Sequence, residues 1–144
     1  MTIYGAGWEN CEWITRPNVF YGGKISAEAV LEKMQDAKIV LNTMTWFKDG
    51  THERIFNGML QGAVTVSDSS VYMKEEFCGS PSCGEKQDMV LFELDELEQL
   101  PAYVNELLQD MTKAQKIADN RYAKAKNLHT WKVRADELEE GLFQ

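Results

Sequence analysis

Long apolar runs, positive charge and cysteine are all scarce in this chain of 144 residues. It has no run of about 18 apolar residues, so we expect no membrane-spanning helix. The formal net charge is −8, which argues against nucleic acid or an anionic membrane surface as a general partner. A small anionic ligand held by a few local cations is still compatible with this charge balance.

The chain has only three cysteines and two histidines, which leaves few ligands for a metal site. Cys78 and Cys83 lie in the loop F-C-G-S-P-S-C-G, far in sequence from both histidines, whereas a zinc site needs about four ligands. The alternatives are zinc ligation, a disulfide and free thiols, and the turn-like composition favours free thiols. Free thiols fit a reducing compartment, so we expect a cytoplasmic protein without a metal.

The rest of the composition is ordinary for a globular protein, with 44% hydrophobic and 26% charged residues. The length predicts one domain over residues 1–144. Short apolar, β-branched segments alternate with amphipathic ones, which predicts an α/β fold with a mostly parallel sheet and C-terminal helices. We expect strands at 2–4, 19–21, 38–42, 63–66 and 89–92, and helices after 26, over 51–61 and 71–77, from 101, over 112–125 and over 129–140.

Residues typical of helix ends support these boundaries. Ser26 is a good N-cap, and Gly62 stands where the 51–61 helix needs a left-handed closing residue. Thr112 and Gln115 have the spacing of a capping box for the next-to-last helix. Trp131 is expected to anchor the last helix by packing.

The densest polar motif is D-G-T-H-E-R-I-F-N-G-M-L-Q-G-A-V-T-V-S-D, from Asp49 to Asp68. Its polar residues gather where a loop enters the 51–61 helix. Helix starts beside strand ends bind anions in α/β folds, because free N–H groups and the helix dipole point outward there. The motif therefore predicts an anion or nucleotide site. The alternatives are a simple Asp49-Gly50 turn, a packed His52, and a surface ion pair of Arg54.

Gly5-Ala6-Gly7 follows the first expected strand, but it does not complete a dinucleotide-binding motif. Asn10 stands at the third glycine position of G-x-G-x-x-G, and Gly22-Gly23 stands where a ribose-binding carboxylate belongs. The remaining interpretations of Gly5-Ala6-Gly7 are a tight turn and a close approach of the backbone to some other ligand. The spacing shows no P-loop, Ser–His–Asp or Cys–His arrangement, although His129 to Arg134 forms a second polar and aromatic cluster.

Three blocks of the sequence resemble a known family. They are Y-G-G-K-I-S-A-E-A-V-L-E-K-M-Q-D-A-K-I-V-L-N, the Asp49–Asp68 motif, and H-T-W-K-V-R-A. Together they resemble the C-terminal domain of CgeB-like, family-1-type GT-B glycosyltransferases, from about Ile3 to about Leu138. The resemblance implies a Rossmann-like three-layer α/β/α domain that binds a nucleotide sugar as substrate and needs no cofactor. It also implies an N-terminal domain of the parent protein that binds the acceptor.

The resemblance also suggests roles for individual residues. The family helix typically carries R-x-F-E; Arg54 and Phe56 match it, whereas Asn57 replaces the ribose-binding Glu. Asp49 stands eight positions before Asn57, where related enzymes carry an acidic residue near the donor sugar. The catalytic candidates are Asp49 and His52, and the nucleotide-binding candidates are Gly5, Gly7, Trp8, Gly50, Arg54, Asn57 and Asp68.

Two other classes of protein are alternatives to a glycosyltransferase domain. A catalytically degenerate nucleotide-binding or regulatory α/β module fits the loss of the Glu at Asn57. A receiver-like signalling domain would need acidic residues after the first strand and an Asp after the third, and Gly5-Ala6-Gly7 and Asn42-Thr43 stand there instead.

Overall fold

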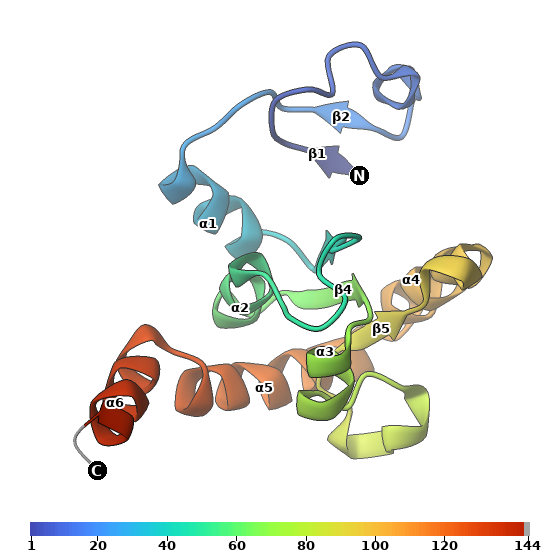
Figure 1. Ribbon diagram of the computed structural model, residues 1–144. Coiled ribbons are helices and arrows are strands. Elements are labelled where there is room, and N and C mark those ends of the chain that lie inside the picture. Colours follow the sequence, from blue (N-terminus) through green and yellow to red (C-terminus); the bar gives the residue numbers. More distant parts are fainter. Residues whose placement is uncertain (143–144) are drawn as a thin grey trace. The chain divides into compact units, whose positions relative to one another are not determined.

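The computed structural model describes residues 1–142, and the chain forms two compact units, Met1–Lys33 and Met34 onward (Figure 1). In the first unit, β1 (Thr2–Ile3) pairs in parallel with β2 (Phe20–Tyr21), and a 3-10 turn, η1 (Glu12–Thr15), lies between them. Helix α1 (Ala27–Gln35) follows. Its expected N-cap is confirmed, because Ser26 Oγ accepts a hydrogen bond from the Ala29 amide at 3.2 Å.

The second unit is built on three parallel strands in the order β3-β4-β5. These are β3 (Ile39–Asn42), β4 (Val64–Asp68) and β5 (Val90–Phe92). Helix α2 (Glu53–Leu60) connects β3 to β4, and α3 (Val71–Glu76) with the 3-10 segment η2 (Pro81–Lys86) connects β4 to β5. The chain ends with η3 (Leu94–Gln99), α4 (Leu100–Gln109), α5 (Met111–Leu128) and α6 (Trp131–Leu142).

The predicted α/β class is confirmed, and every strand pair is parallel. The strands nevertheless lie in two sheets, of two and three strands, because β1 and β2 pair only with each other. Within the described residues, no helix is long and apolar enough to cross a membrane.

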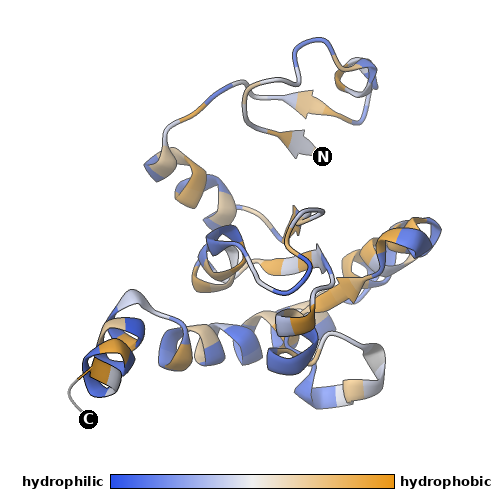
Figure 2. Cartoon of the chain, in the orientation of Figure 1, coloured by the Kyte–Doolittle hydropathy of each residue, from blue (hydrophilic) through white to orange (hydrophobic). Residues whose placement is uncertain are grey.

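Helices cover both faces of the three-stranded sheet. On one face, valines and Phe92 of β4 and β5 pack against α4 and α5; this cluster contains Val64, Val66, Val90, Phe92, Leu107, Ala114, Ile117 and Ala118. The other cluster joins α2, α3 and the end of α5 through Met44, Ile55, Met59, Met73, Phe77, Met89 and Ala125. Figure 2 shows hydrophobic residues along much of β4 and β5, and helices in which hydrophobic and hydrophilic residues alternate. The second unit thus has the predicted three-layer arrangement.

Helix α2 lies close to the sheet because of a glycine at the contact. A Cβ atom built on Gly58 would lie 3.0 Å from Thr65 Oγ1 and 3.6 Å from a Val40 methyl group. The helix ends as predicted at Gly62, whose φ of 79° is left-handed. These two glycines fix the distance of α2 from the sheet and the turn into β4.

The predicted N-cap of α5 is wrong by two residues. Asp110, not Thr112, is the N-cap, and its Oδ1 accepts a hydrogen bond from the Lys113 amide at 2.9 Å. Gln115 donates to Asp119 Oδ1 at 2.8 Å instead of closing a capping box. Aspartate is as good an N-cap as threonine, so the spacing alone did not decide between them.

Two further predictions are corrected by the structure. Trp131 is 86% exposed at the start of α6, so it does not anchor that helix by packing. Cys78 and Cys83 form a disulfide rather than free thiols, because η2 folds the loop until their Cα atoms lie 5.9 Å apart. The disulfide removes the cysteine argument for a reducing compartment.

Candidate functional site

The loop of residues 43–52 leaves the carboxyl end of β3 and leads into α2, and it is held on both sides by hydrogen bonds. Asp68, at the end of β4, accepts from the Met44 amide at 2.5 Å. The Lys48 carbonyl accepts from the Val71 amide at 3.1 Å. The carboxyl ends of β3 and β4 therefore position this loop, at the edge of a parallel sheet where α/β folds bind ligands.

Asp68 was predicted to bind nucleotide, and the structure places it inside the protein. The residue is 1% exposed, and Oδ1 lies 3.4 Å from the Ser67 hydroxyl besides accepting from Met44. Gly50 is bound in a similar way, because its carbonyl accepts from the Ser70 hydroxyl at 2.6 Å. These contacts assign Asp68 and Gly50 a direct role in holding the loop.

His52 is the N-cap of α2. Its Nδ1 accepts from the Arg54 amide at 3.2 Å and lies 3.3 Å from Arg54 Nε. The same nitrogen lies 2.9 Å from Glu53 Oε2, a contact that requires a hydrogen on Nδ1. One nitrogen cannot accept from Arg54 and donate to Glu53 at once, so the helix cap and the contact with Glu53 exclude each other.

Three candidate side chains at this loop are free to meet a ligand. Asp49 and Arg54 are exposed and Asn57 is half-buried. Within residues 1–142, Arg54 makes no ion pair, contrary to the alternative of a pair with Glu53 or Asp49, and the Asn57 amide makes no hydrogen bond. The structure thus brings Asp49, Arg54 and Asn57 together on one loop and the helix that follows it.

The glycine loop after β1 lies in the first unit. Gly5 and Gly7 have φ values of 122° and 92°, which require glycine, and Trp8 is exposed. The Gly7 amide donates to Glu9 Oε2 at 2.8 Å, and Glu9 Oε1 accepts from the Tyr21 hydroxyl at 2.8 Å. A phosphate at the Gly7 amide would therefore have to displace the Glu9 carboxylate.

The H-T-W-K-V-R-A block packs against α2 through His129. The His129 ring stacks on Phe56 with centroids 4.9 Å apart and lies 5.5 Å from the Phe77 ring. Its Nδ1 is 2.9 Å from an Arg134 nitrogen and 3.4 Å from the Tyr72 hydroxyl. Because Phe56 lies between Arg54 and Asn57 in sequence, this packing fixes the helix that carries both.

Glu76 and Lys124 extend the same cluster. Glu76 Oε1 lies 3.3 Å from His129 Nε2, outside hydrogen-bond geometry, and 3.5 Å from Lys124 Nζ. Lys124 Nζ also donates to the Glu76 carbonyl and lies 4.7 Å above the Phe77 ring. Burial lowers the pKa of His129, Glu76 opposes that effect, and Arg134 and Lys124 add to it. His129 is therefore neutral at pH 7.

Arg121 is the largest fully buried side chain of α5, with 0% exposure. Its three guanidinium nitrogens have no hydrogen-bond partner among the described residues. Burial lowers its pKa to about 9, against the opposing charge of Asp88. The Asp88 carboxylate accepts instead from the Cys78 amide at 2.8 Å and lies 3.5 Å from Lys124 Nζ.

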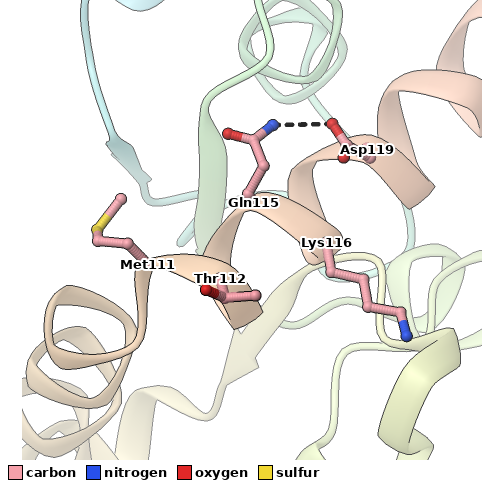
Figure 3. A pocket seen from close by; sticks show the side chains of 5 residues that line it. All are labelled: Met111, Thr112, Gln115, Lys116 and Asp119. Carbon is pink, nitrogen blue, oxygen red and sulfur yellow. Dashed lines mark hydrogen bonds between the residues drawn. The ribbon is translucent and has the colours of Figure 1, made fainter.

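A hollow on the surface lies along the exposed side of α5, well separated in sequence from the candidate residues. Figure 3 shows its lining, with Gln115 turned toward Asp119. The lining residues are Met111, Thr112, Gln115, Lys116 and Asp119. All five residues lie in the first half of a single helix, α5, so the hollow is a feature of that helix surface.

No pattern in the sequence pointed to Tyr72, Glu76, Lys124 or Glu9. The contact of Tyr72 with His129 spans 57 positions, and no helical or strand period connects residues so far apart. A signal did exist for His129 and Arg134, since both lie in the H-T-W-K-V-R-A block of the family resemblance, but it did not reveal that they pack against α2.

The geometry defines a Rossmann-like α/β domain in which a polar loop leads into a helix at the carboxyl edge of the parallel sheet. Comparison with known proteins agrees. The model of the family described as "Glycosyl transferase-like" matches residues 1–140, so the chain belongs to that family. By family and fold it is a GT-B glycosyltransferase domain.

Solved structures with the same fold include HepE of Anabaena, determined with UDP-glucose and with UDP and glucose. The TM-scores are 0.72 and 0.73 at 21% identity, over 90% of this chain and 34% of HepE. Sucrose-phosphate synthase of Thermosynechococcus elongatus has a TM-score of 0.68 at 15% identity, over 87% of this chain and 30% of the synthase. The chain thus spans about a third of the length of these proteins. Among curated proteins, none matches it.

Proposed function

We propose that this chain is the nucleotide-sugar-binding, C-terminal half of a CgeB-like GT-B glycosyltransferase. The observation that carries the proposal is the hydrogen-bonded loop of residues 43–52 and the helix that follows it, which present Asp49, Arg54 and Asn57 with no ion pair among the described residues. Membership of the glycosyltransferase-like family and the UDP-sugar complexes of HepE support it. A second domain of the parent protein would bind the acceptor, and the protein would act in the cytoplasm.

Each free side chain has a role that suits its chemistry. The Arg54 guanidinium can hold two diphosphate oxygens with parallel hydrogen bonds. Asn57 can donate one hydrogen bond and accept another from the ribose hydroxyls, but it lacks the charge of a glutamate. Asp49 would contact the donor sugar, and His52, as the cap of α2, would act beside it. Gly5, Gly7 and Trp8 would approach the diphosphate if Glu9 withdrew from the Gly7 amide.

Isothermal titration with UDP, GDP, dTDP, ADP, CMP and UDP-glucose tests the proposal. We expect weak binding of one nucleoside diphosphate and its sugar conjugate. Arg54→Ala should weaken binding by about 1.5–3 kcal/mol, the range for hydrogen bonds to charged groups. Lys116→Ala is the matched control, because it removes the same charge from the surface of α5, where Lys116 pairs only with Glu85.

Asn57→Glu is the companion variant, and it should tighten binding by restoring a charged ribose acceptor. Unchanged affinity in both the Arg54 and Asn57 variants would remove α2 from the site. Sugar transfer to an acceptor should be absent with this chain alone, because the proposed acceptor half would be needed to hold the acceptor in a reactive geometry. Transfer at an ordinary enzymatic rate would contradict the division into donor and acceptor halves.

The second candidate is a degenerate nucleotide-binding or regulatory module. Two observations favour it: Asn57 stands in place of the family glutamate, and the Glu9 carboxylate already occupies the Gly7 amide. If the module has lost its nucleotide as well as catalysis, none of the six compounds would bind at millimolar concentration. Binding of any one of them with the expected Arg54 dependence would reject that loss.

A further inference from the structure

Trp46 is 92% exposed although the loop that carries it is fixed. On one side the Phe47 amide donates to the Met44 carbonyl at 2.8 Å, closing a turn around Trp46. On the other side, Lys48 and Asp49 accept from amides at the start of α3, at 3.1 and 3.3 Å. The indole is therefore held out into solvent by an anchored backbone, and its large apolar surface is left uncovered.

The neighbours of Trp46 combine an aromatic surface with hydrogen-bonding groups. The Phe47 ring packs edge-on against His52, with centroids 5.8 Å apart. The exposed carboxylate of Asp49 follows three positions after Trp46, and Arg54 begins the next helix. A flat apolar ring and a carboxylate exposed on the same short loop suit a sugar, which offers C–H groups on its faces and hydroxyls at its edge. A bare phosphate would gain nothing from the indole.

The other strongly exposed tryptophan of this unit differs in its setting. Trp131 lies on α6 together with exposed Leu138 and Leu142, at helical spacing. That arrangement is an apolar stripe of the kind that packs against another helix. Trp46 has charged and polar neighbours instead, at the carboxyl edge of the sheet. The contrast favours a small polar ligand over a protein surface for Trp46.

We propose that Trp46 stacks on the sugar ring of the nucleotide-sugar donor and so lets the site prefer the sugar conjugate over the free nucleotide. The inference rests on the proposed function, since it assumes that a nucleotide sugar binds at this loop. It adds a sugar-recognition residue that neither the sequence motifs nor the Asp49–Asn57 spacing indicated.

Affinity measurements on the intact protein separate the contribution of the sugar to binding from that of the nucleotide. Trp46→Ala should weaken UDP-glucose binding roughly tenfold, as expected for the loss of one aromatic partner, and UDP binding less than about twofold. Trp46→Phe should keep most of the affinity. Trp131→Ala is the matched control, because it removes an equally exposed indole, and it should change neither. An equal loss for both ligands, or no loss, would overturn the proposal.

Fluorescence gives a second readout that keeps Trp46 itself intact. With Trp8, Trp13 and Trp131 changed to Phe, Trp46 is the only tryptophan left, and calorimetry on this variant checks that UDP-glucose binding survives the loss of Trp8. UDP-glucose should shift or quench its emission, whereas UDP should not. If calorimetry shows UDP-glucose binding and the emission stays constant, the stacking is refuted while the proposed function stands. If wild-type protein binds neither compound nor any other nucleotide, the proposed function fails and the stacking fails with it.

Discussion

Acid should destabilise this protein through His129 at pH values where most carboxylates are still charged. The His129 side chain is 2% exposed between the Phe56 and Phe77 rings. Burial is the main cause that lowers its pKa from 6.5; Glu76 acts in the opposite direction, and Arg134 and Lys124 reinforce the lowering. The folded protein therefore takes up the His129 proton only at a lower pH than the unfolded chain does.

The sign of the effect follows from proton counting. Between the lowered pKa of the folded state and 6.5, the unfolded chain binds more protons, so the free energy of unfolding rises with pH. The contribution is complete above pH 6.5 and is lost as the pH falls through this window. One proton limits the slope to about 1.4 kcal/mol per pH unit.

Urea unfolding at pH 7.5, 6.5 and 5.5 measures this slope. His129→Phe keeps a flat ring against Phe56 but cannot be protonated, so its stability should change less between these pH values. His52→Gln is the control, because it removes the other histidine of the chain and should leave the wild-type slope. At pH 7.5, His129→Ala should lose about 3 kcal/mol, as other large buried rings do. A His129→Phe slope equal to that of wild type would refute the reasoning.

Three other perturbations test the packing around the site. Reducing the Cys78–Cys83 disulfide, whose partners are five positions apart, should lower the free energy of unfolding by about 2 kcal/mol. Calorimetry with and without a reducing thiol measures this, and an unchanged melting temperature would contradict it. Arg121→Met should leave stability equal or raise it by up to about 3 kcal/mol in urea unfolding, because it removes a buried charge without a described partner; a clear loss would reveal a partner such as a buried water. Gly62→Ala should cost about 1 kcal/mol, since φ is 79° there, and a neutral result would show that the turn relaxes.

Local signals in the sequence predicted most of the elements. The alternation of apolar, β-branched segments with amphipathic ones identified each strand and helix near its observed place, and Ser26 and Gly62 act as expected. Such signals are local because caps and periodicity depend on neighbours within one or two turns. They did not predict the division of the strands into two sheets, which depends on pairing between β1 and β2 across 18 positions.

The failures share one physical cause, because each concerns contacts that no local pattern encodes. Turn composition around Cys78 and Cys83 suggested free thiols, but the path of η2 brings the two together. A tryptophan on an amphipathic helix is usually buried, and Trp131 is exposed because α6 places it away from both apolar clusters. Burial depends on how elements pack in three dimensions, which composition does not determine.

The candidate site shows the same limit at the level of single residues. The motif from Asp49 to Asp68 located the polar junction correctly, yet it could not distinguish residues that hold the loop from residues that face a ligand. A loop at a strand end needs acceptors and donors for its own amides and carbonyls, since these cannot pair within a strand or helix. Asp68, Gly50 and His52 meet that need, each through a hydrogen bond to the loop, to α3 or to the first turn of α2. What is left after this accounting, Asp49 and the Arg54–Asn57 face of α2, is the part of the motif that is free to recognise a donor.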